Sequence, residues 1–123
     1  MNFIDPKEYD AIVKALEIYC NEGGAAGNVA GVKKAFHEKA VMNGSGKDGY
    51  VFGPIQNLYD LYEKTGGDKN VACHVDVLDI AGNTAVARIV IKNWHGMDFV
   101  DFHELIKENG EWKIIAKTYQ QVF

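Results

Sequence analysis

The stretch FVDFHELIKENGEWKIIAKTY, residues 99–119, decides the fold of this chain. It places Asn109-Gly110 between two runs rich in β-branched and aromatic residues. An Asn-Gly pair flanked by alternating apolar residues is a strong signal for a β-hairpin. The stretch therefore predicts two antiparallel strands joined by a tight turn.

Two registers are compatible with this hairpin. A two-residue loop at 109–110 would place Glu108 opposite Glu111, whereas a loop with a glycine bulge would place Asp101 opposite Lys117. Like charges directly opposite each other destabilise a sheet, so we predict the second register. In that register one face combines Val100, Phe102, Ile106, Trp112, Ile114 and Ala116, and the other combines Phe99, Asp101, His103, Leu105, Ile115, Lys117 and Tyr119.

Two further strands precede the hairpin. Residues 71–77 alternate apolar and more polar side chains, and residues 84–92 are dense in β-branched residues. Turn signals at 82–83 and 95–96 separate these runs. The chain after residue 70 is therefore predicted to form a meander of four antiparallel strands.

Three helices are predicted ahead of the strands. Asp5-Pro6 supplies a capping carboxylate and a proline suited to the first turn, and Gly23-Gly24 ends this helix. A second, shorter helix follows Asn28, and a third is opened by Gly53-Pro54 and closed by Gly66-Gly67. Helices grouped before consecutive hairpins indicate an α+β fold, with the helices on one face of a curved antiparallel sheet.

Length and composition indicate one soluble domain over residues 1–123. The chain is 47% hydrophobic and 24% charged, as in ordinary globular proteins. It has 17 acidic against 13 basic residues, and its single arginine is Arg88, so it lacks the clustered positive charge that nucleic-acid binding needs. No segment approaches the ~18 apolar residues of a membrane span, and residues 1–6 show no secretion signal. We expect a cytoplasmic protein with no nucleic-acid or membrane partner.

Neither a metal nor another cofactor is expected. Cys20 and Cys73 are isolated thiols without Cys-x-x-Cys spacing, and the histidines lack the spacing of metal ligands. His37 and His74 are predicted to lie at the surface and His95 in a turn. An enzyme built on this chain would therefore be cofactor-independent.

Residues 43–49, NGSGKDG, look like a phosphate-binding loop but differ from it at two positions. The motif is G-x-x-x-x-G-K-[ST], in which the hydroxyl holds Mg²⁺. Val41 replaces its first glycine, and Asp48 stands where the hydroxyl residue should be. A carboxylate there would also repel a phosphate. The segment is therefore predicted to be a flexible polar loop.

Three segments together resemble the nuclear transport factor 2-like superfamily. They are Phe36-His37-Glu38-Lys39-Ala40 after the short helix, Gly53-Pro54-Ile55 at the start of the third helix, and the pattern Asp101…Leu105…Gly110-Glu111-Trp112-Lys113-Ile114…Lys117. Within the superfamily the likeness is closest to the putative lumazine-binding family, a relative of the SnoaL-like polyketide cyclases. Because the superfamily includes enzymes, transport factors and assembly domains, the resemblance indicates a fold more than an activity.

The resemblance implies a cone-shaped, cystatin-like fold with a cavity open at one end. In such a cone the sheet wraps around the first helix, and residues 43–53 would lie near the mouth as a rim or lid, or form a plain surface connection. It also implies a homodimer through the outer face of the sheet. We expect this dimer because the face with Phe99, Leu105, Ile115 and Tyr119 is too apolar to remain in water.

Asp101 and His103 are the candidate catalytic residues, because they lie on the same face in either register. If that face lines the cavity, they form a carboxylate–imidazole pair able to move protons near neutral pH. If it faces outward, Asp101 forms an ion pair with Lys117 at the dimer interface. We expect the second arrangement.

Two enzymes of the superfamily provide further comparisons. Ketosteroid isomerase uses an Asp base with a Tyr and a protonated Asp as oxyanion donors. Tyr19 could match the tyrosine, but residues 40–43, where the base would be sought, contain no carboxylate. A site like that of scytalone dehydratase could come only from Asp101 and His103.

Aromatic side chains indicate what the cavity would bind. Phenols and indoles present a polar edge on an apolar body, and Tyr19, Tyr50, Phe52 and Trp94 are the predicted ligand-binding residues. The expected partner is a small hydrophobic or aromatic molecule. We expect a non-catalytic or weakly catalytic binding domain first, an isomerase, cyclase or dehydratase using Asp101 and His103 second, and an assembly module with a vestigial cavity third.

Overall fold

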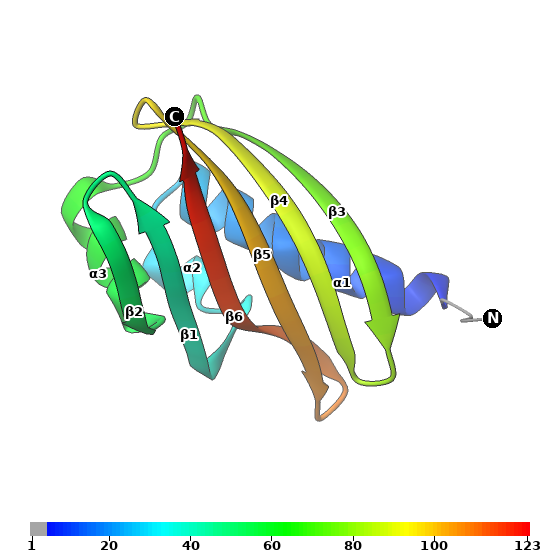
Figure 1. The fold of residues 1–123 in the computed structure, drawn as a ribbon. Helices are drawn as coiled ribbons and strands as arrows, with labels where there is room; N and C mark the ends of the chain where they lie inside the picture. The colour runs from blue at the N-terminus through cyan, green and yellow to red at the C-terminus, as the bar shows by residue number, and fades with distance from the viewer. Residues whose placement is uncertain (1–4) are drawn as a thin grey trace.

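The computed structural model describes residues 5–123 and consists of helices packed on one face of a single curved sheet (Figure 1). The expected absence of a secretion signal concerns residues 1–6, of which residues 1–4 lie outside the described part of the chain. The architecture is the expected α+β fold, with the sheet bent around the first helix.

The first helix, α1 (Pro6–Ile18), begins as predicted. The Asp5 carboxylate accepts a hydrogen bond from the Lys7 backbone N–H at 2.8 Å, and Pro6 occupies the first turn. No helix between residues 5 and 123 combines the length and the apolar character needed to cross a membrane.

The helical segments that follow differ in detail from the prediction. α1 continues directly into a π-helical segment, η1 (Tyr19–Ala25), whose wider turns were not predicted. α2 (Val29–Val32) follows Asn28 as expected. α3 (Gln56–Thr65) begins later than expected, because Gly53-Pro54 completes a strand instead of opening the helix.

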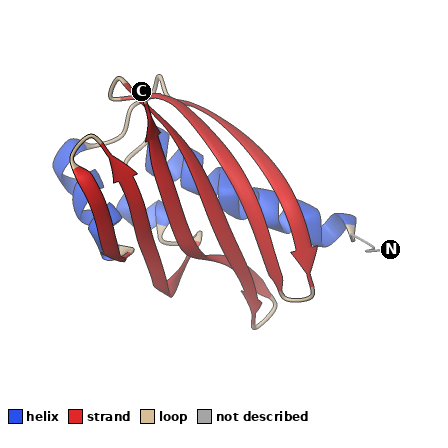
Figure 2. Cartoon of the chain, in the orientation of Figure 1, coloured by secondary structure: helices blue, strands red, loops and turns tan. Residues whose placement is uncertain are grey.

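Six strands form the sheet in the order β2-β1-β6-β5-β4-β3. The run from β3 to β6 confirms the predicted four-stranded meander, whereas β1 and β2 form an additional hairpin at one edge (Figure 2). β1 pairs with β6 in parallel, and all other neighbours are antiparallel. The strands are β1 (Phe36–Gly46), β2 (Gly49–Pro54), β3 (Ala72–Ala81), β4 (Thr84–Trp94), β5 (Met97–Glu108) and β6 (Glu111–Val122).

The β1–β2 hairpin corrects the prediction of a flexible loop at residues 43–53. Four glycines made this stretch look irregular, since glycine is rare in strands. One of them has a packing role: a Cβ at Gly44 would overlap the ring of Tyr119 on β6. The glycine thus lets an aromatic ring lie flat against the β1 backbone.

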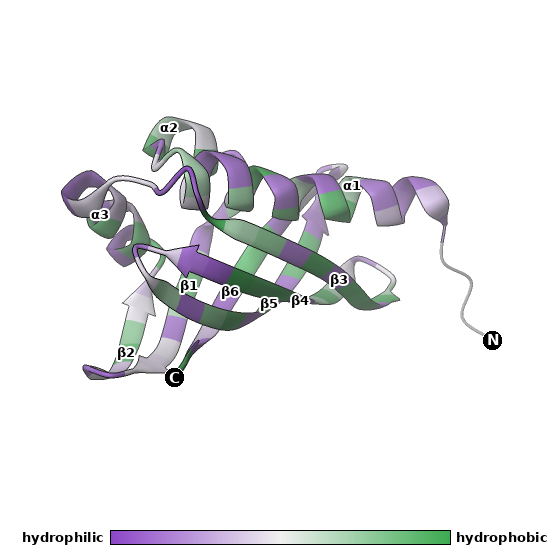
Figure 3. Ribbon diagram, turned by 90° about the horizontal axis from the view of Figure 1, so that it is seen from above, coloured by the Kyte–Doolittle hydropathy of each residue, from purple (hydrophilic) through white to green (hydrophobic). Residues whose placement is uncertain are grey.

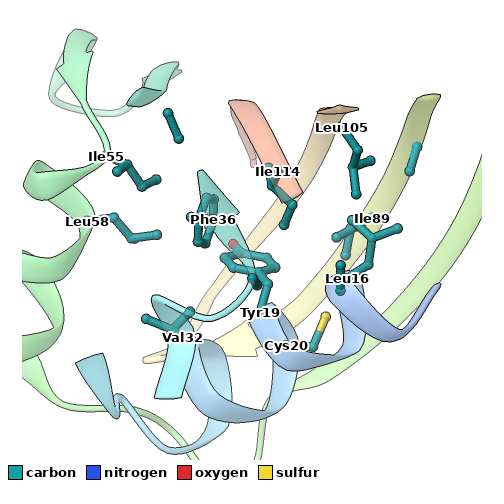
Figure 4. Packing of buried hydrophobic residues seen from close by; sticks show 14 of the residues in the cluster. Leu16, Tyr19, Cys20, Val32, Phe36, Ile55, Leu58, Ile89, Leu105 and Ile114 are labelled. Carbon is teal, nitrogen blue, oxygen red and sulfur yellow. The ribbon is translucent and has the colours of Figure 1, made fainter. Parts of the chain in front are cut away.

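The hydrophobic core lies between α1 and the inner face of the sheet. Ile12 and Leu16 on α1 contact a layer built from the sheet, and Ile89, Leu105 and Ile114 within that layer are at most 1% exposed (Figure 4). Seen from above, the helices lie along one side of the sheet, and hydrophobic and hydrophilic residues alternate along the strands (Figure 3). This alternation is the period-two pattern that the sequence displays.

The predicted register of the β5–β6 hairpin is wrong. Glu108 lies opposite Glu111 across a two-residue turn, in which Asn109 and Gly110 have φ values of 54° and 78°. Positive φ at both positions is what a type I′ turn requires. Both glutamates are exposed, so water weakens their repulsion and the turn geometry sets the register.

A bulge farther along the hairpin keeps its apolar residues on the inside. Glu104 pairs with Ala116 and Leu105 pairs with Ile114, which leaves Ile115 as the extra residue. The shift lets Leu105 and Ile114 both point into the core.

The predicted outer face of this hairpin is therefore also wrong. Phe99 and Tyr119 pack against the core, and Leu105 is part of it. These side chains cannot form an outer dimer interface, because they lie on the inner side of the sheet. Trp112, assigned to the opposite face, is buried as well.

Candidate ligand cavity and buried charge cluster

A cavity of about 380 Å³ lies between the inner face of the sheet and the helical layer. Its volume falls within the range of roughly 300–1,000 Å³ that is typical of small-molecule sites. Most of its wall is apolar. The side chains that line it include Tyr19, Cys20, Met42, Val51, Leu58, Leu61, Tyr62, Cys73, Ile91, Trp94, Met97, Phe99, Lys117 and Tyr119.

The exposure of the lining residues shows which end of the cavity is open. The 46–49 turn of the β1–β2 hairpin and His95 of the β4–β5 turn line the cavity and are largely exposed. Tyr19 and Lys117 line it and are buried, so they form its inner wall. The β1–β2 hairpin takes the place of the expected rim loop, and its 46–49 turn lies at the opening of the cavity.

Four polar side chains from three elements meet at this inner wall. The Oδ2 atom of Asp101 on β5 accepts hydrogen bonds from the Tyr19 hydroxyl (3.0 Å), His103 Nε2 (3.0 Å) and Lys117 Nζ (3.1 Å). Asp101 and His103 are fully buried. Such a carboxylate is tolerable in a dry interior only because charged and polar donors surround it.

The electrostatics of the cluster favour an ionised Asp101. Burial by itself raises the pKa of Asp101, but the positive charge of Lys117 and the hydrogen bond from His103 outweigh it and hold that pKa below its ordinary value. Burial and the Asp101 charge raise the pKa of Tyr19 far above the usual value for tyrosine. Tyr19 is therefore a neutral donor.

His103 is neutral in this cluster. Burial lowers the pKa of His103, and the nearby Lys117 charge adds to this, so that together they outweigh the stabilising effect of Asp101. A carboxylate oxygen can only accept, so Nε2 carries the proton of the ring. Nδ1 of His103 and Oδ1 of Asp101 are both buried and have no hydrogen-bond partner among residues 5–123.

Of these four side chains, Tyr19 and Lys117 line the cavity, whereas Asp101 and His103 lie behind them. The Lys117 Nζ lies 4.8 Å from the ring centre of Tyr119 and 5.5 Å from that of Tyr19, distances typical of cation–π contacts. The structure thus combines features of both alternatives: the predicted pair faces inward, yet Asp101 is paired with Lys117. The expected position of Asp101 at an outward-facing dimer interface is therefore wrong.

The predicted ligand-binding residues divide between the two faces of the sheet. Trp94 lines the cavity together with Tyr19, and its indole N–H donates to the Gly24 carbonyl at 3.1 Å. Tyr50 and Phe52 are 77% and 75% exposed and line a separate depression on the outer face. Their expected place in the cavity is wrong because, on strand β2, they alternate with the inward-facing Val51.

The other candidate residues lie away from the charge cluster or show no ligating arrangement. His37 contacts Glu108 at 3.0 Å, and the exposed His74 contacts Asp76 at 3.1 Å. In the part of the chain that the structure describes, no three His, Cys, Asp or Glu side chains are grouped as metal ligands.

Several cavity residues were not predicted as such. Phe99 and Tyr119 had been assigned to the outer face, yet both line the cavity. The available signal was the alternation along β5, which places Phe99 on the same face as Asp101 and His103. The inward direction of that face becomes visible only with α1 in place.

Known proteins are similar to this chain over nearly their full length. A nuclear transport factor 2-like protein of unknown function from Shewanella baltica is 32% identical, with a TM-score of 0.89 over 99% of each chain. One from Methylobacillus flagellatus is also 32% identical, with a TM-score of 0.91 over 98% of this chain and 96% of the other. The aldolase FrzH of Cladobotryum is 26% identical over 117 residues, 94% of this chain and 93% of that protein.

The sequence profile described as putative lumazine-binding matches residues 7–120. The match reaches from the first turn of α1 into β6 and so includes part or all of every helix and strand. This chain therefore belongs to the putative lumazine-binding family and has the nuclear transport factor 2-like fold.

Proposed function

We propose that the protein binds a small, largely apolar molecule in its cavity and holds an oxygen atom of that molecule at Lys117. One observation carries the proposal: the inner part of an otherwise aromatic and aliphatic cavity presents the ammonium group of Lys117, a residue that is only 5% exposed. Apolar surroundings select an apolar ligand body, and one convergent polar group fixes its orientation.

Lys117 has hydrogen-bonding capacity left for a ligand. An ammonium has three N–H donors, and one is directed to Asp101. A carbonyl, carboxylate or phenolate oxygen can accept from the others, and a charge-assisted bond of this kind is stronger than a neutral one. Flat molecules with one such oxygen fit the aromatic wall.

A thermal-shift screen of aromatic ketones, aldehydes and carboxylates tests the proposal. A ligand at 100 times its Kd stabilises a one-site protein by about 2.7 kcal/mol. Cys73→Phe, which fills the cavity from β3, should abolish the shift, whereas Leu78→Phe, at a 52% exposed position of the same strand, should retain it. The proposal fails if no compound stabilises the protein or if both variants respond alike.

A second candidate function is catalysis on a carbonyl compound. A relative spanning almost the whole chain is named an aldolase, and the buried cluster joins a carboxylate to two groups at the cavity wall. Asp101 and His103 do not themselves line the cavity, so they would act through Tyr19 and Lys117. Exchange of α-protons of a bound ketone with deuterated solvent, followed by NMR, would detect this activity, and its absence for every bound ketone would leave binding alone.

A further inference from the structure

We propose that Lys117 forms a covalent imine with an aldehyde or ketone that enters the cavity. This inference rests on the proposed function, because the carbonyl compound must first bind there. It goes beyond binding in assigning a bond-forming role to one amine.

The position of Lys117 differs from that of the other lysine at the cavity. Lys117 is buried at the inner wall between two tyrosine rings, whereas Lys47 is in the exposed turn at the open end. Lysines are almost never buried without a partner, and buried lysines are the ones that proteins use for imine chemistry. A carbonyl carbon held at the inner wall therefore meets this amine.

The amine must lose a proton before it can attack, and its neighbours can accept and return that proton. Asp101 Oδ2 lies 3.1 Å from Lys117 Nζ, and Asp101 Oδ1 has no partner among the described residues. The Tyr19 hydroxyl lies 3.0 Å from the same Oδ2 atom and also lines the cavity. Asp101 is thus connected to both groups that a carbonyl would touch.

The bond-forming step balances with these groups alone. Lys117 gives a proton to Asp101, and its lone pair forms the C–N bond while the C=O π electrons move to oxygen. Tyr19 protonates that oxygen and recovers a proton from Asp101. The nitrogen then gives a second proton to Asp101, which passes it to Tyr19 while Tyr19 gives its own proton to the hydroxyl, and that group leaves as water. The net change converts an ammonium and a carbonyl into an iminium and water.

The charge balance of the cluster selects the class of carbonyl compound. An iminium carries the positive charge that Lys117 had, so the buried Asp101 carboxylate again has a countercharge once the iminium has formed. Acylation by an ester would turn the amine into a neutral amide and leave Asp101 without a countercharge, which is costly in a buried site. The site therefore favours aldehydes and ketones over esters.

Reductive trapping with 2-naphthaldehyde and sodium cyanoborohydride tests the proposal. Intact mass and peptide mapping should locate one adduct at Lys117, formed at least about tenfold faster than at any of the eleven other lysines. An activated acetate ester should not modify Lys117. Labelling spread over surface lysines at similar rates, with Lys117 unmodified, would overturn the proposal.

Two arginine substitutions provide the matched comparison. Lys117→Arg keeps a cation for Asp101 but removes the nucleophile, so fast labelling should disappear. Lys113→Arg, on the same strand and away from the cavity, should leave it unchanged. Thermal shift with 2-naphthaldehyde alone separates the imine proposal from the binding proposal. If the compound stabilises the protein but forms no adduct, the imine proposal is refuted and the binding proposal stands. If the compound neither stabilises the protein nor forms an adduct, both proposals are contradicted. If Lys117→Arg does not fold, peptide mapping of the unsubstituted protein still decides.

Discussion

Asp101 accepts hydrogen bonds from three elements: from Tyr19 at the start of η1, from His103 on its own strand β5 and from Lys117 on β6. No other described side-chain atom accepts as many hydrogen bonds from side chains. The charge of Asp101 therefore holds the helical layer and the hairpin together at one point.

Replacing Asp101 by Asn tests this role. The amide keeps the shape but leaves the buried Lys117 charge without its partner, so we expect a loss of about 3–5 kcal/mol in the free energy of unfolding. Urea denaturation measures it. Asp98→Asn, on the same strand but paired with Lys92 at the surface, should have little effect. Equal stability of the two variants would contradict the role of Asp101.

His103 should make stability depend on pH in a range where few side chains titrate. Its pKa in the folded protein lies below 6.5, the value of a free histidine, so between the two values the unfolded chain binds more protons. Stability is then complete above pH 6.5 and is lost as pH falls from 6.5 toward the folded pKa.

The matched variant is His103→Gln, which keeps an N–H donor for Asp101 but does not titrate. Urea midpoints measured at a series of pH values should decline just below pH 6.5 in the unsubstituted protein and stay level in the variant. Asp101 affects stability at lower pH. Its pKa is lowered in the folded protein, so its contribution to the free energy of unfolding is present above pH 3.8 and is lost as the pH falls below that value. An identical decline in both proteins would rule out His103 as the source.

The β1–β2 hairpin shows how an element can depend on a contact that its own sequence does not reveal. At Gly44 there is no room for a Cβ, because the Tyr119 ring occupies that space. Gly44→Ala should cost about 1–3 kcal/mol, the range for overpacking, and should push Tyr119 toward Lys117. Thermal unfolding measures the cost, and Ser45→Ala, next to it on β1, is the control. An unchanged melting temperature for Gly44→Ala would show that the ring can move freely.

The sequence could predict the elements whose signals are local. The cap of α1 and the period-two runs of β3 to β6 depend on neighbouring residues, and both predictions are confirmed. β1 and β2 were missed because their glycines lack strand propensity and β1 is held by parallel pairing with β6, which is distant in sequence. The predicted register of the β5–β6 hairpin was wrong because the repulsion between Glu108 and Glu111 was given more weight than the geometry of the turn, although the tip is exposed.

The candidate site could be predicted only in part, because only some of its signals are local in the sequence. Alternation places Asp101 and His103 on one face of β5, as the structure has them. The inward direction of Lys117 depends on the bulge at Ile115 on β6, and the contact of Asp101 with Tyr19 depends on the junction between α1 and the π-helical segment. Neither irregularity has a clear signature in the sequence.

We propose that two copies of the protein associate through the outer face of the sheet. The exposed rings of Tyr50 and Phe52 stack there, with centres 6.1 Å apart and planes 5° from parallel. Beside them, Phe102 is 49% exposed and lines the same outer depression. Projecting rings next to a hollow allow a self-complementary two-fold interface, and large exposed aromatic patches are unfavourable in water.

Light scattering at micromolar concentration should give a dimeric mass for the unsubstituted protein and a monomeric mass for Phe52→Asp. Leu78→Asp, an exposed apolar position on β3 away from this patch, should remain dimeric. A monomeric mass for the unsubstituted protein would refute the proposed interface.

The central place of β6 governs the order in which the molecule can assemble. β6 lies between β1 and β5, so it joins the early hairpin to the meander, yet it is the last strand to leave the ribosome. Until then β1 has no partner on that side, and Asp101 is exposed to water without Lys117. Closing the sheet and giving the buried Asp101 charge its partner therefore depend on the same strand, and neither can happen before β6 has been synthesised.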